Sequence, residues 1–324
     1  MKVFAQKMKD MLETRKQQLA TKKRNNDGFT LLELLVVVAI LAAIAGTATI
    51  ALKDTDARAS AAAHVTMMDE LNKGISTFRV LQRNVLPNRF DSLMASDLGT
   101  ATGIDAIPTA ALGFDGATEA FPAAITADIQ GIMADAGITE LRYIDGTATP
   151  PDAVAGSEDC TNAHIQDLIA SKRNAVVAGN IFMSEDANGC GMSVTLSGAS
   201  TTDPIGLYWM GGQERLTGQP GPTGEFDGTN LATATGNAYL LTGIGPSSTL
   251  FDANTLGGMT TVPVYRHVKP NEYNRFIAVW NVGEYDGAGN IVAADQLNLT
   301  AIVDGALDTK EEELGEWDGT RNTI

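Results

Sequence analysis

Lys22-Lys23-Arg24-Asn25-Asn26-Asp27-Gly28-Phe29-Thr30-Leu31-Leu32-Glu33 decides the fold of this chain, because an apolar run, Leu34–Leu52, follows it directly. That run has 19 residues and no charged side chain. Counted from Phe29 to Leu52, the segment has 24 residues and a single charge, at Glu33. At about 1.5 Å per residue, a helix of this length reaches about 36 Å, enough to cross a hydrocarbon core of about 30 Å. The sequence therefore predicts one membrane-spanning helix near the N-terminus.

The basic residues before this segment predict its orientation. Five of the eight Lys and Arg residues that precede it lie within 15–24. Basic residues close to a membrane span favour the cytoplasmic side. We therefore expect residues 1–28 to stay in the cytoplasm and the chain after the span to be exported.

Three interpretations of the apolar segment compete. An ordinary secretory signal has a shorter apolar region and a small-residue cleavage site after it; here Ala57–Ser60 is only a weak site of that kind. A plain membrane anchor fits the length but explains neither Gly28-Phe29 nor Glu33. A charge near the middle of an insertion helix costs roughly 2.5–3.5 kcal/mol, so a carboxylate in this segment is expected to have a role.

The basic cluster, Gly28-Phe29 and Glu33 together resemble the class III signal peptide of type IV pilins and of the pseudopilins of type II secretion. The resemblance implies cleavage between Gly28 and Phe29 by a prepilin peptidase, followed by N-methylation of Phe29. Glu33 falls at the acidic position of that family. In a filament core it would pair with the α-amino group of Phe29 from a neighbouring subunit, and breaking such a buried pair costs several kcal/mol.

The resemblance implies a structural subunit with no enzymatic activity. Its expected partners are the prepilin peptidase, an inner-membrane assembly platform, and copies of itself or other pilins in a filament. Its expected location is the bacterial inner membrane, as a single-pass protein, and after assembly a periplasmic or cell-surface filament. The alternatives are a type II secretion pseudopilin, a minor subunit at a filament tip, and a membrane-anchored extracytoplasmic binding protein or enzyme.

The charge of the chain argues against nucleic acid as the main ligand. The whole sequence has a net charge of −16, and residues 1–28 alone carry +5, so the remainder carries −21. Binding to phosphates needs clusters of Lys and Arg, which a strongly acidic exported chain does not offer. The exported part is expected to present an acidic, self-repelling surface.

The apolar helix is expected to continue as an amphipathic one. Apolar residues recur at steps of three and four from Ala57 to Leu81, which predicts a helix from Phe29 to Arg83 that stops at Asn84 and Pro87. We predict three parts: a cleaved leader (1–28), a spine helix (29–84, with 29–52 in the membrane or filament core) and an exported head (85–324). The fold class is α+β, a long N-terminal spine carrying a globular head with an antiparallel β-sheet.

In the head, short apolar runs alternate with turn residues. Three short helices are predicted, at Phe90–Leu98, Ala123–Ala136 and Ala163–Lys172, with Gly137 as a C-terminal glycine. Strands are predicted at Ile138–Ile144, Ala175–Met183, Met192–Ser197, Ile205–Met210, Ala238–Thr242, Val262–Val268, Arg275–Val282 and Leu297–Val303. Pro270-Asn271-Glu272 suggests a hairpin between Val262–Val268 and Arg275–Val282, and the tail from Lys310 is expected to be a short helix.

No catalytic constellation stands out in the head. His64, His164 and His267 have no zinc-like spacing, and His64 is expected to be a surface or seam residue. Trp209, Trp280 and Tyr208 are expected in the core or the sheet.

Two further features concern the exported environment. Cys160 and Cys190 are candidates for a disulfide, since export favours one. No cofactor is expected. The oxygen-rich turns at Glu185–Gly189 and Asp286–Asn290 are candidates for binding calcium, but they lack the full calcium-binding loop and equally suit ordinary turns.

Overall fold

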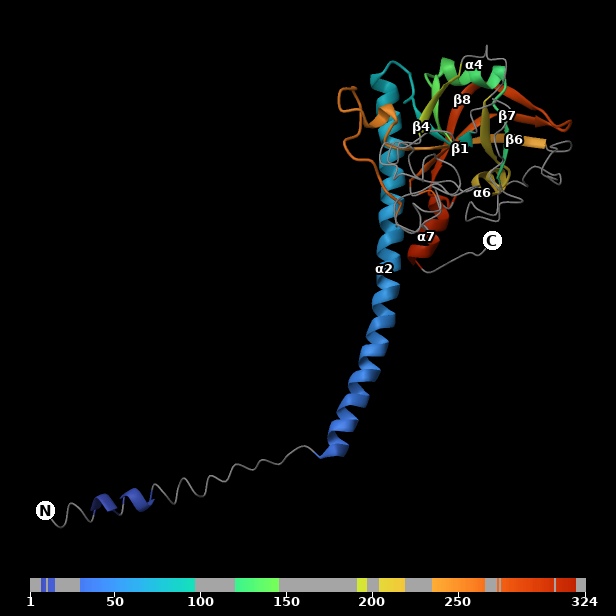
Figure 1. Ribbon diagram of the computed structural model, residues 1–324. Coiled ribbons are helices and arrows are strands. Elements are labelled where there is room, and N and C mark those ends of the chain that lie inside the picture. Colours follow the sequence, from blue (N-terminus) through green and yellow to red (C-terminus); the bar gives the residue numbers. More distant parts are fainter. Residues whose placement is uncertain are drawn as a thin grey trace, which may run out of the picture. The chain divides into compact units, whose positions relative to one another are not determined.

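The computed structural model describes residues 7–9, 11–14, 30–96, 120–145, 191–196, 204–218, 235–265, 273, 275–305 and 307–318. The chain divides into two compact units, Met1–Asp56 and Ala57–Ile324. Helix α2 (Leu31–Leu81) begins in the first unit and continues into the second (Figure 1). The predicted spine helix is thus confirmed, within two residues at each end.

Helix α2 ends where the sequence predicts. Arg83 and Asn84 both adopt positive φ values, 58° and 73°, which turn the chain out of the helix. The Asn84 backbone N–H donates to the Arg79 carbonyl at 2.7 Å, and the Asn84 Oδ1 atom accepts from Arg79 Nε at 2.7 Å. A left-handed residue after the last turn is a common helix stop, and asparagine is tolerated there.

The described residues of the head form one sheet of eight strands, ordered β2-β5-β6-β1-β3-β4, with β7 beside β6 and β8 beside β7. Its strands are β1 (Phe90–Ser96), β2 (Ala120–Ala124), β3 (Glu140–Asp145), β4 (Gly191–Thr195), β5 (Ile205–Trp209), β6 (Thr235–Gly243), β7 (Ile277–Asp286) and β8 (Ile291–Val303). All pairs are antiparallel except β1 with β3, which are parallel. The α+β class is confirmed, and the sheet is mixed rather than wholly antiparallel.

The predicted helix at Phe90–Leu98 is wrong over residues 90–96, which form strand β1. Its apolar residues Phe90 and Leu93 are three apart, a helical spacing, and both are buried. In the structure Leu93 has a positive φ of 62°, and the pairing with β3 shifts register between Asp91 and Ala95. Such an irregularity breaks the two-residue alternation of a strand, so the periodicity of the sequence imitates a helix.

Helix α4 (Ala127–Asp135) confirms the second part of the predicted helix at Ala123–Ala136, whereas the first part belongs to β2. Gly137 ends this helix as predicted, with φ at +101°. Its N–H donates to the Ala134 carbonyl, and the N–H of Ile138 donates to the Met133 carbonyl. This pair of bonds is the Schellman arrangement that favours glycine at a helix C-terminus.

The remaining predictions divide into three groups. Strands β3, β4, β5, β6, β7 and β8 confirm six predicted strands, and helix α7 (Lys310–Asp318) confirms the predicted tail helix. The predicted strand at Val262–Val268 is wrong over residues 262–265, which form no strand. The hairpin expected there is replaced by β7 pairing with β6 and β8.

Several predictions lie outside the described residues: Gly28, Phe29, the helix at Ala163–Lys172, the strand at Ala175–Met183, the calcium expectation at Glu185–Gly189, and both Cys160 and Cys190. Two short elements were not predicted: helix α6 (Gly212–Thr217) and the 3-10 turn η3 (Thr249–Phe251).

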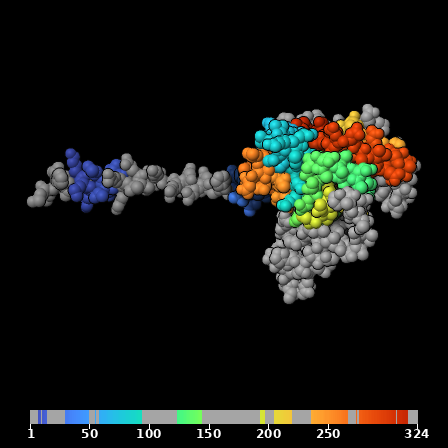
Figure 2. Space-filling model, turned by 90° about the horizontal axis from the view of Figure 1, so that it is seen from above, coloured from blue at the N-terminus to red at the C-terminus, as the bar shows by residue number. Residues whose placement is uncertain are grey.

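The head core is shared by the second part of α2 and the sheet. Leu71, Ile75 and Phe78 of α2 are buried and belong to one apolar cluster with the sheet residues. Within it the rings of Phe90 and Trp280 lie 5.5 Å apart, and Trp280 Nε1 donates to Thr242 Oγ1 at 2.7 Å. Figure 2 shows α4 (green) at the surface beside β7 and β8 (orange to red), which it contacts.

Candidate functional site

The first turn of α2 holds Glu33 in a capping box. The Glu33 Oε2 atom accepts from the Thr30 backbone N–H at 2.8 Å and from Thr30 Oγ1 at 3.0 Å. In return, the Glu33 N–H donates to Thr30 Oγ1 at 3.2 Å. These bonds satisfy backbone donors at the start of the helix, which otherwise lack partners. The signal for this role was visible in the sequence as Thr-x-x-Glu before an apolar run, and it was missed.

The helix that follows is long and apolar enough to span a membrane, over Leu31–Thr49. Its large side chains, including Leu35, Leu41 and Ile44, are exposed in this chain. Thr47 and Thr49 donate their hydroxyls to carbonyls of the preceding turn, at 3.0 Å and 2.8 Å. The hydroxyl groups of the segment are therefore satisfied within the helix, and its surface is free to pack against lipid or other helices.

A second group of polar residues lies in the head, where α7 meets α2. His64 of α2 is buried, and its Nδ1 atom lies 3.2 Å from Glu313 Oε1 of α7. The His64 ring also packs against Tyr265, with ring centroids 4.5 Å apart. The sequence predicted a surface or a seam position for His64. The structure places it in the seam between α2 and α7, and the surface alternative is wrong.

Three carboxyl groups gather at this place. Oxygen atoms of Asp304, Asp308 and Glu313 all lie within 4.8 Å of one another. Burial and the hydrogen bond with Glu313 raise the pKa of Asp304 to about 8. Burial and the nearby Asp304 raise the pKa of Asp308 to about 6. The acidic group therefore retains protons well above the usual range of a carboxylic acid.

Arg215 of α6 supplies positive charge to this group. Its Nε and Nη2 atoms donate to the two Glu312 oxygens at 2.9 Å and 2.7 Å, and Nη2 donates to Asp308 at 3.1 Å. Burial opposes ionisation of Glu312, but the bonds from Arg215 and Thr309 outweigh it and lower its pKa. The Arg215 guanidinium also lies 5.5 Å from the centre of the Trp209 ring. This two-pronged contact ties α6 to α7.

The three carboxyl groups of Asp304, Asp308 and Glu313 lie close enough together to suit a divalent cation, which prefers oxygen ligands. Arg215 already supplies positive charge to Asp308, and Glu313 faces the His64 imidazole. Protonation relieves repulsion among the remaining oxygens. We therefore assign no metal to these residues.

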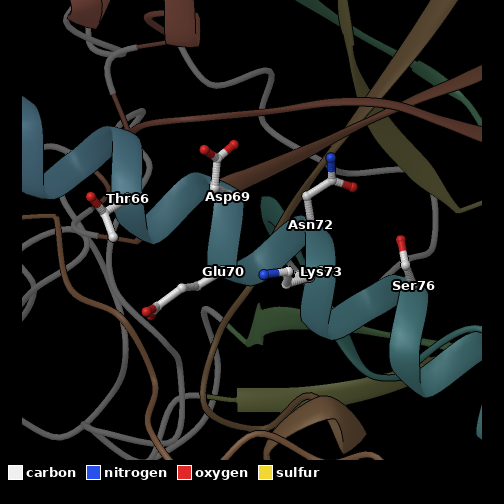
Figure 3. Close-up of a pocket in the computed structure, with 6 residues that line it drawn as sticks. All are labelled: Thr66, Asp69, Glu70, Asn72, Lys73 and Ser76. Atoms are coloured by element: carbon white, nitrogen blue, oxygen red, sulfur yellow. The ribbon is translucent and has the colours of Figure 1, made fainter.

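A polar surface runs along α2 on its outer side. Six side chains line an open depression of about 600 Å³, namely Thr66, Asp69, Glu70, Asn72, Lys73 and Ser76 (Figure 3). All six come from the same helix and point outward from it in different directions. Lys310 of α7 reaches this surface and contacts Asp69 at 2.6 Å. The surface has no nucleophile beside a base and offers no catalytic arrangement.

The other predicted residues fall into structural places. Asp286 and Asn290 form the turn between β7 and β8, where Asp286 Oδ1 accepts from the Ala288 and Asn290 N–H groups. A hydrogen bond from the Asn290 side chain contributes most to lowering the pKa of Asp286, and these two backbone bonds lower it further. Trp209, Trp280 and Tyr208 are buried in the core, as predicted.

Comparison with known families places the N-terminal segment. Residues 23–49 match the family described as the prokaryotic N-terminal methylation motif. This motif is the hallmark of the prepilin-type segment, so the resemblance stated from Gly28, Phe29 and Glu33 is confirmed. It is a structural motif and not an enzyme class. Comparisons with curated proteins and with solved structures gave no match.

The match supports a type IV pilin-like or pseudopilin-like protein in general, and the single apolar N-terminal helix fits a membrane-anchored one. The match covers only the first part of α2 and leaves the head unassigned.

Proposed function

We propose that this protein is a structural subunit of a type IV pilus-like filament. The observation that carries the proposal is the prepilin-type motif at residues 23–49, placed on a helix whose apolar part, Leu31–Thr49, is exposed. An exposed apolar helix of this length needs lipid or other helices around it. A subunit that passes from membrane to filament provides both environments in turn.

Processing is the first step of this function. A prepilin peptidase cuts between Gly28 and Phe29 and removes the leader of net charge +5. The new N-terminus at Phe29 is then methylated. The cut leaves Thr30 as the second residue of the mature chain, so the capping pair of Thr30 and Glu33 stays intact.

Glu33 acts next, in assembly. In an apolar filament core, the α-amino group of Phe29 from one subunit is a buried cation, and the Glu33 carboxylate of a neighbour neutralises it. The Glu33 oxygens that accept from Thr30 within one chain can accept from the neighbour's amine as well, since a carboxylate has about four acceptor sites. Copies of the chain and the inner-membrane assembly platform are the partners of this step.

Mass spectrometry of the mature N-terminus tests the proposal. We expect a chain that begins at N-methylated Phe29 in cells with an active prepilin peptidase, and the full leader in cells without it. A mature chain that begins before Lys22 or after Ala57 would refute the proposed processing.

A type II secretion pseudopilin is the second candidate, because the matched motif is shared by pilins and pseudopilins. Imaging of sheared surface material separates the two. Long surface filaments that contain this chain support the pilus, whereas a short periplasmic assembly supports the pseudopilus.

A further inference from the structure

Helix α7 lies against α2 through two side-chain contacts. Lys310 Nζ contacts the Asp69 carboxylate at 2.6 Å, at the exposed edge. Glu313, one turn further along α7, reaches His64 Nδ1 at 3.2 Å, in the buried part. The two partners in the buried contact are 249 residues apart in the chain. The C-terminal helix is thus fastened to the spine at one exposed and one buried point.

The buried point contains two acids side by side. Asp304, at the end of β8, has no exposed surface, and Glu313 is 4% exposed. Oxygen atoms of both lie within 4.8 Å of each other. Two ionised carboxylates at this separation repel strongly in a poorly solvated environment, and a proton bound between them removes the repulsion.

The neighbouring charges do not remove this repulsion. The Arg215 guanidinium is directed at Glu312 and Asp308. The His64 imidazole faces Glu313. The Tyr265 phenol, which is neutral, faces Asp304. The titratable and charged groups that surround the acid pair from α2, α6, α7 and the adjoining loops are therefore His64, Arg215, Glu312, Asp308 and Tyr265.

We propose that a proton shared between Asp304 and Glu313 holds α7 to the end of β8, and thereby keeps it docked against α2, so that α7 undocks as the medium becomes alkaline. The C-terminal helix is then a strap whose closure depends on pH. Undocking uncovers the buried face of α2 around His64 and frees Asp69 from Lys310.

The sign of the effect follows from the direction of the pKa changes. The pKa of Asp304 rises to about 8 when α7 is docked, from an ordinary value near 4. The docked state therefore binds one proton more than the undocked state over this range, and docking weakens as pH rises. Asp308, with its pKa raised to about 6, acts in the same direction at lower pH.

Hydrogen exchange of the full chain in detergent micelles tests the proposal. Protection of the α7 amides is measured from pH 6 to pH 9, corrected for the intrinsic exchange rate, with the β7 amides as an internal reference. We expect the opening constant of α7 to rise by up to about tenfold per pH unit between pH 6 and 8, for one proton released. The β7 amides should keep their protection.

Asp304→Asn is the decisive variant, because the amide has the shape of the protonated acid and cannot ionise. We expect the pH dependence of α7 to disappear in this variant. Glu311→Gln is the matched control, because it also removes one charge from the same region but at an exposed position. In this variant the pH dependence of α7 protection should equal that of the unchanged chain. Infrared spectroscopy supplies a readout that needs no variant, since a protonated carboxyl band should persist above pH 7.

Three results would overturn the proposal. The first is equal loss of protection in α7 and β7, which would indicate global unfolding. The second is a pH dependence that persists in Asp304→Asn, which would place the titrating group elsewhere, for example at His64. The third is an α7 protection that responds to calcium or EDTA at constant pH, which would show that a cation and not a proton holds the acid pair together.

Discussion

The two parts of helix α2 are continuous in backbone and opposite in surface. In the first part, Leu31–Thr49, large apolar side chains are exposed on all sides, as at Leu41, which is 59% exposed. In the second part, one face is buried in the head, and Leu71 has no exposed surface. The first part is polar nowhere after Glu33 except at its threonines, whereas the second has an open polar side lined by residues such as Asp69 and Lys73.

This difference shows that one continuous helix has two surfaces of different character. The second part is stabilised within its own chain, because the head covers its apolar face. The first part exposes large apolar side chains, which the proposed function covers with lipid or with neighbouring helices. We therefore expect mutations to separate the folding of the head from the proposed assembly through the N-terminal segment.

The largest expected effect comes from an alanine substitution in the buried part. Leu71→Ala should lower the free energy of unfolding of the head by about 2–5 kcal/mol, because it leaves a cavity in the core. Leu41→Ala, the same change in the exposed part, should leave that free energy unchanged. Denaturant unfolding followed by tryptophan fluorescence in micelles measures both. Equal effects of the two substitutions would contradict the separation of the two parts.

A smaller effect is expected at two glycines. Gly137→Ala should destabilise the head by about 1–2 kcal/mol, since φ is +101° there and an added Cβ would meet Val85 Cγ1. Gly46→Ala meets no atom within 4 Å and lies inside a helix, where alanine is favoured by about 1 kcal/mol. We expect it to raise helix content in circular dichroism without a change in head unfolding. A destabilised head in Gly46→Ala would show that the two parts are coupled.

The smallest effect on stability is expected at the start of α2, where it separates two roles of Glu33. Thr30→Ala removes a cap worth about 0.5–2 kcal/mol to the first turn. Glu33→Gln keeps the capping pattern but removes the charge. If Glu33 pairs with a neighbour's amine, Glu33→Gln should be cleaved normally yet give a low yield of sheared filaments, while Thr30→Ala should assemble better. The reverse order would assign Glu33 to capping alone.

Local patterns were enough to predict much of the molecule. The apolar run and the stripe from Ala57 to Leu81 predicted α2, and Asn84 and Gly137 predicted two helix ends. The motif around Glu33 predicted the matched family segment. Each of these signals lies within a few neighbouring residues, and each reflects a preference that a short piece of chain expresses by itself.

Predictions failed where distant pairing decided the structure. Strand β1 was expected to be a helix, because its register shift at Asp91–Ala95 depends on pairing with β3, some fifty residues later. The residues at Val262–Tyr265 looked like a strand but found no partner, since β6 and β8 take both edges of β7. The group around Asp304 and Glu313 had no signal in the sequence, as acidic residues are frequent throughout the chain.

The sequence by itself therefore determined the spine helix and the prepilin-type motif at its start, since length, hydropathy and spacing along one segment are sufficient to predict a long apolar helix. Only the tertiary structure decided which strands pair and which charges are buried. His64, Asp304 and Glu313 come together because α7 folds back onto α2, and burial then raises the pKa of Asp304. A carboxylate acquires an unusual pKa only from its surroundings, and surroundings of this kind are made by contacts between distant parts of the chain.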